Sequence, residues 1–431
     1  MLAQYAGTPQ QREGRRPVEY RIHGTAMKRP KILALILAGG AGGRLGVLTE
    51  HRAKPALPFA GTLRLIDFSL SNCLHSGLTD VWVIEQYQLH TLNDHLANGR
   101  PWDLDRTYGG LQVLPPSVEG ADEDGDGDSE EAGKERQGGL AEGNADAIYR
   151  QRKLLREFAP DLVVVLSADH VYKLDYRDVV DLHRERGAEV TMVTTRVPPG
   201  DDASRFGVVQ TDADGRVTDF DYKPKKPRGD QITAEVFVYD TKVLLATLDE
   251  IVEDGSELKD YGDELLPRLV KRGKAWAFPL DGYWRDVGTV ESYWQAHADL
   301  LASDNKLGLD HPDWPILTYG PQHLPAHLKS GAAPTDSLIS PGCVVSGKVT
   351  DSVLSPGVII EEGAEVVGSI LLHDARIKAG ARVTRTVVDE QAEVGAQAIV
   401  GGPDGEFTVV GKGARVPADG RLAPGKKLSP A

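Results

Sequence analysis

Cysteine is scarce in this chain of 431 residues, which contains only Cys73 and Cys343, far apart in the sequence. Two isolated cysteines provide neither a disulfide framework nor the paired spacing of a zinc site. Long hydrophobic runs are also missing, because the apolar stretch 32–43 is too short and too rich in glycine to cross a bilayer. We therefore expect a cytoplasmic protein that has no membrane partner.

Positive charge is in short supply as well. Lysine and arginine number 49 against 64 aspartate and glutamate residues, which gives a formal net charge of −15. An acidic surface repels polyanions, so nucleic acid is not an expected partner. The shares of hydrophobic (40%) and charged (26%) residues are those of a folded enzyme. The length suggests two or three domains.

Two segments lack the apolar pattern of a folded core. Residues 1–30 carry six basic and two acidic residues, and we expect a disordered tail in which Met27 could be the true start. Residues 119–138 are strongly acidic and contain no aliphatic side chain larger than alanine. They could form a metal or regulatory site, but their composition favours a disordered surface insertion that has nothing to bury.

Between residues 31 and 303, apolar runs alternate with amphipathic stretches. The strand-like runs are 32–37, 81–84, 162–166, 190–194 and 236–239, and the helix-like stretches are 65–75, 91–98, 145–158, 176–186 and 242–252. Such alternation predicts an α/β domain with a mostly parallel sheet covered by helices. Residues 208–211 and 217–220, joined by an Asp-Ala-Asp-Gly turn, predict a hairpin.

The pattern changes after residue 336, where apolar residues recur every 17 positions. The three rows are Cys343, Ile360, Ile377 and Val394; Val349, Val366, Val383 and Val400; and Val353, Ile370 and Val387. A fixed period over three rows predicts a parallel β-helix of three to four coils in residues 336–431, rather than a small sandwich. Residues 304–335, which are rich in proline, are expected to be a linker.

A glycine-rich turn follows the first strand-like run and ends in Arg44. Gly39, Gly40 and Gly42 would let backbone amides approach a phosphate chain, which Arg44 could clamp. The turn is not a dinucleotide fingerprint, because Leu45 stands where that motif needs glycine, and no Gly-Lys-Ser/Thr follows to make a P-loop. By itself, such a turn is a weak signal of phosphate binding.

Two cations and two carboxylates extend this candidate site. Arg52 and Lys54, held among prolines, suit a triphosphate, although such a pair could also form a surface salt bridge. Asp169 comes just after the strand-like run 162–166, at the end of the sheet where ligands bind. Together with Asp286 it could hold Mg²⁺ shared with substrate phosphates, if the two residues meet in space.

Several strings of residues resemble the bacterial ADP-glucose pyrophosphorylase (glucose-1-phosphate adenylyltransferase) family. They cover about residues 31–401, in order and with family-like spacing. The main strings are Arg-Ala-Lys-Pro-Ala at 52–56, Ile-Asp-Phe-x-Leu-Ser-Asn-Cys at 66–73, Gln-Tyr-Gln at 86–88, Ala-Asp-Ala at 145–147, Phe-Gly-Val at 206–208 and Tyr-Trp-Arg-Asp-Val-Gly-Thr at 283–289. The resemblance implies a Rossmann-like (GT-A-like) nucleotidyltransferase domain followed by a left-handed parallel β-helix.

The resemblance also implies a reaction and roles for individual residues. In such enzymes the phosphate of glucose 1-phosphate attacks the α-phosphate of ATP, pyrophosphate leaves and ADP-glucose forms for glycogen or another α-glucan. The chemistry depends on alignment and charge neutralisation. The implied roles are catalysis for Arg44, Lys54, Asp169 and Asp286; Mg²⁺ binding for Asp169 and Asp286; nucleotide binding for Gly39, Gly40, Gly42, Arg44 and Gln86; and glucose 1-phosphate binding for Gly207, Lys223 and Thr233.

The chain departs from the family pattern mainly in the sugar and base pockets. Residues 140–144 read Leu-Ala-Glu-Gly-Asn in place of the family's Trp-Tyr-Arg-Gly-Thr, and Tyr222 replaces a glutamate that binds sugar hydroxyls. Residues 233–235 replace Ser-Met-Gly, and Thr62 replaces a lysine that binds activator phosphates. Two alternatives therefore stay open: a nucleotidyltransferase for another sugar 1-phosphate or nucleotide, and a poorly catalytic regulatory subunit.

The β-helix is also expected to make an interface. Its rows that contain Val353 and Cys343 are expected to point into the coil, which leaves Leu354, Leu371, Ala375 and Val388 as an apolar outer stripe. A bare apolar stripe is unusual on a charged enzyme. We expect it to pack against the catalytic domain and a neighbouring subunit in a homotetramer, the assembly that the resemblance also implies.

Overall fold

The computed structural model describes residues 30–40, 42–115, 140–198 and 201–430. The chain divides at residue 30 into two compact units, Met1–Pro30 and Lys31–Ala431. The expected disordered tail, apart from its last residue, and the acidic insertion 119–138 both lie outside the described residues. Among the described residues, no helix has both the length and the apolar composition that a bilayer crossing requires.

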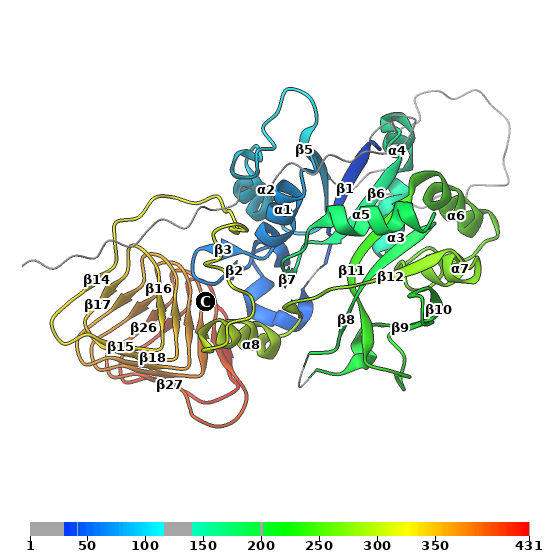
Figure 1. Cartoon of the computed structure of the whole chain (residues 1–431). Helices are drawn as coiled ribbons and strands as arrows, with labels where there is room; N and C mark the ends of the chain where they lie inside the picture. Colours follow the sequence, from blue (N-terminus) through cyan, green and yellow to red (C-terminus); the bar gives the residue numbers. More distant parts are fainter. Residues whose placement is uncertain (1–29, 41, 116–139, 199–200, 431) are drawn as a thin grey trace, which may run out of the picture. The chain divides into compact units, whose positions relative to one another are not determined.

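A nine-stranded mixed sheet, largely parallel, forms the centre of the first part (Figure 1). Its parallel core consists of β1 (Ile32–Ala38), β4 (Asp80–Glu85), β5 (Gly110–Leu114) and β6 (Leu162–Ser167). The other strands are β8 (Val190–Arg196), β9 (Gly207–Thr211), β10 (Val217–Tyr222), β11 (Gln231–Asp240) and β12 (Ala275–Pro279). β11 runs antiparallel to both β6 and β8, and β9 and β10 form the predicted hairpin.

Helices follow most of these strands. They are α1 (Ile66–His75), α2 (Leu89–Leu96), α3 (Asn144–Arg150), α4 (Arg152–Phe158), α5 (Tyr176–Glu185), α6 (Thr241–Glu253), α7 (Leu265–Lys271) and α8 (Val290–Leu301). One expected helix differs: residues 145–158 form two helices, because buried Gln151 leaves the helical region with φ −93° and ψ 7°. The other four expected helices are present within two residues of their predicted ends.

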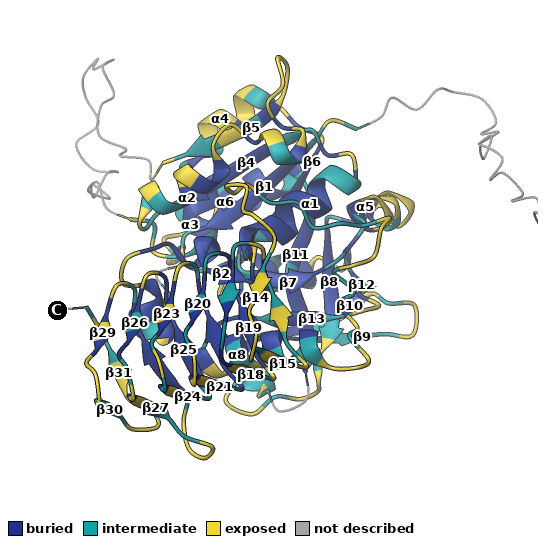
Figure 2. Cartoon of the chain, turned by 90° about the vertical axis from the view of Figure 1, so that its left-hand side faces the viewer, coloured by how far each residue is buried: buried dark blue, intermediate teal, exposed yellow. Residues whose placement is uncertain are grey.

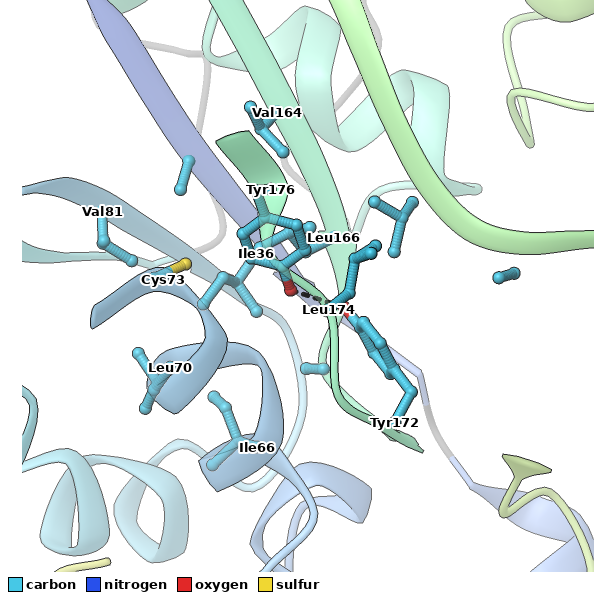
Figure 3. Packing of buried hydrophobic residues seen from close by; sticks show 14 of the residues in the cluster. Ile36, Ile66, Leu70, Cys73, Val81, Val164, Leu166, Tyr172, Leu174 and Tyr176 are labelled. Atoms are coloured by element: carbon cyan, nitrogen blue, oxygen red, sulfur yellow. Dashed lines mark hydrogen bonds between the residues drawn. The ribbon is translucent and has the colours of Figure 1, made fainter. Parts of the chain in front are cut away.

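Both faces of the sheet are buried, which explains why its strands are almost continuously apolar. Ile36 and Val164 point into one cluster, and Leu35 and Val165 point into the other. Figure 3 shows the first cluster, in which α1 and the β7 segment (His170–Tyr172) pack on the strands. The parallel core thereby fixes the ends of β1 and β6, where the candidate site lies.

The second part is a left-handed parallel β-helix whose three faces are six-stranded parallel sheets. The strands are β14 (His327–Leu328), β17 (Val344–Val345), β20 (Ile359–Ile360), β23 (Arg376–Ile377), β26 (Glu393–Val394) and β29 (Arg415–Val416) on one face; β15 (Ala333–Thr335), β18 (Lys348–Thr350), β21 (Glu365–Val367), β24 (Arg382–Thr384), β27 (Ile399–Gly401) and β30 (Arg421–Leu422) on the second; and β16 (Leu338–Ile339), β19 (Val353–Leu354), β22 (Ile370–Leu371), β25 (Thr386–Val388), β28 (Thr408–Val410) and β31 (Lys427–Leu428) on the third.

The predicted number of three to four coils is wrong, because each face holds six described strands. The fixed period of 17 holds only in the middle of the β-helix. Leu338 pairs with Val353, which is a shorter step, and Val387 pairs with Val409, which is a longer one. The first coil already uses His327–Leu328 and Ala333–Thr335, which lie in the range expected to be linker.

One predicted row of side chains is correct and another is wrong. Cys343, Ile360, Ile377 and Val394 all lie inside the coil, as predicted, although Cys343 is in the turn before β17 and Val345 is the strand partner of Ile360. On the third face, Leu354, Leu371 and Val388 fill the coil, as does Ala375 at a turn, whereas Ile370 and Val387 point outward and are buried against the first part. Side chains alternate along a strand, so either of two apolar rows, one residue apart, could have filled the inside of the coil.

The third face does cover the first part of the chain, as expected. Its outward row packs with Leu45, Phe59 and Tyr293 in one apolar cluster. Figure 2 shows that buried residues continue from the β-helix strands into the first part of the chain. The face was therefore predicted correctly, but with the opposite row of side chains, so a substitution of Leu371 disturbs the inside of the coil.

Candidate functional site

A cavity of about 540 Å³ opens at the carboxyl ends of β1 and β6. Nine of the residues predicted from the sequence line it: Gly39, Gly40, Gly42, Arg44, Lys54, Gln86, Asp169, Lys223 and Asp286. Gly207 and Thr233 do not line it, but Phe206, next to Gly207, and Glu235, two residues after Thr233, do. The position agrees with the rule that open α/β sheets bind ligands beyond the carboxyl ends of their strands.

The glycine-rich turn forms one wall of this cavity. Gly42 has φ +66°, a left-handed conformation that favours glycine, and a Cβ there would lie 2.9 Å from Thr49 Cγ2. Thr49 Oγ1 donates to the carbonyl of Gly42 (3.0 Å), which fixes the turn. A Cβ on Gly40 would meet no atom within 4 Å, so the backbone faces open space there. A phosphate chain can approach this backbone closely.

Lys54 occupies the floor of the cavity between two carboxylates. The short 3₁₀ turn Lys54–Ala56 carries it, and its side chain is buried. Its Nζ forms an ion pair with Asp169 and lies 3.4 Å from Asp286 Oδ1. Asp169 also accepts a hydrogen bond from Ser167 Oγ. The predicted meeting of Asp169 and Asp286 is therefore present in space.

A short strand pair brings Asp286 to this place. β13 (Trp284–Asp286) runs antiparallel to β7, and Asp286 is the direct partner of His170. Arg205 Nη2 lies 3.4 Å from Asp286 Oδ2 on the other side. The guanidinium of Arg44 also lies in this region: its Nη2 would be 3.0 Å from a Cβ built on Gly288, two residues after Asp286. The site thus gathers three cations and two acids from distant parts of the chain.

The charged side chains of the site shift one another's pKa values. Burial alone would lower the pKa of Lys54, but the charges of Asp169 and Asp286 outweigh it and raise the pKa above its ordinary value. Burial opposes ionisation of Asp169, yet Lys54, His170 and two hydrogen bonds bring its pKa well below the usual range. Lys54 and Asp169 are therefore both charged at neutral pH.

His170 and Glu235 complete the cluster, and sequence reasoning assigned neither a role. His170 Nε2 lies 3.7 Å from Asp169 and Asp286 and 3.8 Å from Glu235. Its Nδ1 lies 3.2 Å from the carbonyl of Ala234, which can only accept, so the proton of neutral His170 is on Nδ1. A charged residue in the middle of strand β11 was the available signal for Glu235.

Glu235 is held in an unusual backbone conformation. Its φ is +53°, and the pairing of β11 with β8 is irregular between Thr233 and Phe237. Burial raises the pKa of its carboxyl group. Non-glycine residues in the left-handed region are strained, and such strain collects at functional sites. The irregular pairing turns this carboxylate into the cavity.

Lys223 lines the cavity, and Tyr222 lies beside it outside the lining. Tyr222 OH donates to Asp260 Oδ2 (2.8 Å), and Lys223 Nζ donates to Tyr222 OH (2.6 Å). Lys223 also has a positive φ of +46°. Gly262 is required beside the tyrosine, since a Cβ there would lie 2.1 Å from the Tyr222 ring. The side chain of Tyr222 is therefore held by contacts with Asp260, Lys223 and Gly262.

The donor set fits a divalent cation. Asp169 and Asp286 converge, and hard carboxylate oxygens combined with phosphate oxygens are typical Mg²⁺ ligands. Within the part of the chain that the structure describes, no group of three or more His, Cys, Asp or Glu residues forms a complete protein cage. A cation at this place would take its remaining ligands from substrate and water.

Comparison with known proteins connects this geometry to a chemistry. The family "Nucleotidyl transferase" matches residues 33–303, and the family "GlmU-like, C-terminal hexapeptide" matches residues 325–413. The chain is 40% identical to the glucose-1-phosphate adenylyltransferase of Clostridium acetobutylicum, over 75% of this chain and 81% of the relative.

Two further relatives carry the same name. The protein of Desulforamulus reducens is 39% identical over 87% of this chain and 88% of the relative. The protein of Thermotoga neapolitana is 41% identical over 78% of this chain and 76% of the relative. The similarity therefore extends through both parts of the chain and includes the cavity.

Proposed function

The chain belongs to the glucose-1-phosphate adenylyltransferase family, and we propose that it transfers the adenylyl group of ATP to α-D-glucose 1-phosphate. The products are ADP-glucose and pyrophosphate, and the product would serve glycogen or another α-glucan. The observation that carries the proposal is the convergence of Lys54, Asp169 and Asp286 beside a glycine-rich turn. We place the reaction in the cytoplasm, which suits two free, buried cysteines.

The arrangement of charges supports this reaction. A phosphate oxygen of the sugar phosphate attacks the α-phosphorus of ATP, a new P–O bond forms and the bond to pyrophosphate breaks. The attacking oxygen is already ionised, so no base is needed. Gly39, Gly40 and Gly42 bind the triphosphate, and Arg44 and Lys54 neutralise the charge that collects on the leaving pyrophosphate. Gln86 lies where it can contact the nucleotide.

Asp169 and Asp286 would hold Mg²⁺, which supplies further charge neutralisation on the phosphates. Lys223 and Arg205 also line the cavity and would bind the phosphate of the sugar. Gly207 and Thr233 lie behind the wall. A Cβ on Gly207 would come within 2.8 Å of the Phe220 ring and 3.2 Å of Thr233 Oγ1. We assign these two residues to shaping the sugar pocket.

Pyrophosphate release tests the proposed function directly. The purified chain should release pyrophosphate fastest with ATP and glucose 1-phosphate in the presence of Mg²⁺. UTP and dTTP, and a set of other sugar 1-phosphates, serve as competing substrates. A clear preference for another pair would correct the specificity. No release with any pair, together with restored release on mixing with an active relative, would assign the chain as a regulatory subunit.

One observation favours a second candidate, the same chemistry on a different sugar 1-phosphate. A carboxylate repels phosphate, so Glu235 suits a donor such as a sugar hydroxyl, and it lines the same cavity as Lys223 and Asp260. Tyr222 stands where the resemblance leads us to expect a glutamate. The acidic acceptor has thus moved from β10 to β11, and the pattern of hydroxyls that it recognises can differ.

Replacing Glu235 by glycine should therefore change the sugar and not the nucleotide. We expect KM for the best sugar 1-phosphate to rise about tenfold, because a lost hydrogen bond to a charged group is worth roughly 1.5–3 kcal/mol. KM for ATP should stay within twofold. Glu235→Gln, which keeps the shape, is the matched control for volume. A rise in the ATP or Mg²⁺ requirement alone would instead assign Glu235 to the metal side.

We also propose a homotetramer, built in part on the open end of the β-helix. β14, β15 and β16 begin their sheets, and among the described strands none pairs with their outer edge. Leu324, Leu328 and Leu338 are exposed at this end, at 82%, 48% and 40%. Unpaired edges with apolar side chains are ready to pair with another chain.

Light scattering decides this assembly. The wild-type chain should be a tetramer at micromolar concentration, and the double variant Leu328→Lys/Leu338→Lys should dissociate it without unfolding the β-helix. Circular dichroism on the same sample is the control for folding. A fully active wild-type monomer would contradict the proposal.

A further inference from the structure

Two adjacent acidic residues of the β-helix reach the loop that carries Lys54. They are Asp389 and Glu390, which follow strand β25. We call residues 52–57 the lysine loop. Asp389 is fully buried and Glu390 is almost so, although both are charged types that are normally exposed. Their partners explain the burial.

The first partner is Arg52, at the start of the lysine loop. Its Nη2 lies 2.7 Å from Asp389 Oδ1 and 3.2 Å from Glu390 Oε2, and its side chain is 3% exposed. Arg52 is only two residues from Lys54. Both contacts come from Nη2, whose two N–H directions the planar guanidinium fixes, while Nη1 has no partner among the described residues. The β-helix therefore holds the beginning of the loop.

The second partner is Arg64, which holds the end of the loop. Its Nη1 donates to the carbonyl of Ala56 (2.6 Å) and lies 3.4 Å from Glu390 Oε1. Lys412 Nζ, also from the β-helix, lies 3.0 Å from Glu390 Oε2. Asp389 and Glu390 thus connect to both ends of the segment that presents Lys54.

The lysine loop has little internal structure to hold its own shape. It contains one 3₁₀ turn, with backbone hydrogen bonds from Ala56 to Ala53 and from Leu57 to Lys54. Pro55 lacks an N–H to donate. A segment of this kind takes its position from external anchors, and the Arg52–Asp389 pair is the most deeply buried of them.

We propose that Asp389 is a positioning residue for the reaction: through Arg52 it fixes Lys54 against the phosphate chain of the nucleotide. The β-helix is then part of the catalytic apparatus and sets the alignment of the lysine, besides packing on the domain. The inference rests on the proposed role of Lys54. It explains why two acids are buried at the junction, where apolar residues would otherwise pack well.

The competing explanation is that this ion pair only joins the two parts of the chain. A second contact between the parts provides the matched control. Trp294 Nε1 of α8 donates to the carbonyl of Gly368 (2.8 Å), away from the lysine loop. Trp294→Phe removes this hydrogen bond and leaves the loop untouched. A merely structural role predicts that both contacts affect activity in proportion to stability.

The test compares Asp389→Asn with Trp294→Phe in the full-length protein. We expect Asp389→Asn to lower kcat at least tenfold at saturating substrates, since a misplacement of about 1 Å can cost roughly a hundredfold in rate. KM for the sugar phosphate should stay within twofold. Trp294→Phe should keep its kcat at a comparable loss of melting temperature. Equal losses of kcat in both variants would overturn the proposal.

A double variant shows whether Asp389 acts through Lys54. Lys54→Met alone should lose most of the activity, and adding Asp389→Asn should cause no further loss. Losses that multiply would mean that Asp389 acts by another route, and the positioning role would be wrong. If Asp389→Asn does not fold, Arg52→Lys is the second variant, because it keeps the charge but loses the planar geometry; wild-type kcat in Arg52→Lys would also overturn the proposal.

Binding of ATP keeps this inference separate from the proposed function. Calorimetry measures the Kd of ATP whether or not any sugar phosphate turns over. An inactive wild-type protein would contradict the proposed reaction. The positioning role would still predict that Asp389→Asn binds ATP more weakly than the wild type does. An unchanged Kd together with unchanged kcat would overturn the positioning role alone.

Discussion

Turnover should fall by at least about 10²–10³-fold when Asp169 or Asp286 is replaced by asparagine, the range that follows loss of an electrostatic catalytic group. Each substitution keeps the shape of the side chain and removes one negative charge from the place where Mg²⁺ would bind. Both carboxylates also face Lys54, so the lysine would lose one of two counter-ions. Pyrophosphate release at saturating Mg²⁺ measures the effect.

A surface aspartate provides the matched control for these two variants. Asp249 forms an ion pair with Arg156, and both side chains are partly exposed. Exposed pairs contribute little to stability, so Asp249→Asn should keep both the melting temperature and the turnover of the wild type. If Asp169→Asn or Asp286→Asn retained wild-type turnover at saturating Mg²⁺, the assignment of that residue to the metal would be wrong.

The parallel core and the phosphate side of the cavity could be predicted because their signals are local. β1 and β6 are buried on both faces and read as apolar runs. The glycine-rich turn and Asp169 each come directly after such a run. Parallel strands place their carboxyl ends at one edge of a sheet, so local order in the sequence becomes proximity in space.

The other side of the cavity depends on contacts that the sequence does not display. Asp286 reaches Asp169 only because β13 pairs with β7, and two strands of three residues give little pattern of their own. Glu235 enters the cavity through an irregularity in the pairing of β11 with β8. The buried pair of Arg52 and Asp389 joins residues from the two parts of the chain. Such contacts leave no periodic pattern in the sequence.

The β-helix shows the same limit in another form. Its period revealed the fold, but each short strand of the third face carries apolar residues on both sides, as in Ile370 and Leu371. One side fills the coil and the other packs on the catalytic part. Alternation assigns sides only when one of them is polar. The inner row was therefore a choice between two equal patterns.

Leu371→Glu should abolish folding of the β-helix, because Leu371 is fully buried inside the coil between Leu354 and Val388 in the ladder. An isolated carboxylate in such surroundings costs more than the roughly 5–15 kcal/mol that stabilises a domain, unless it becomes protonated.

Ile399→Glu is the matched control. Ile399 is 37% exposed and lies between Arg382 and Arg421, whose positive charges attract a carboxylate. Circular dichroism melting should show the transition of the β-helix for Ile399→Glu but not for Leu371→Glu. A folded Leu371→Glu protein that merely dissociates into monomers would mean that Leu371 faces outward after all.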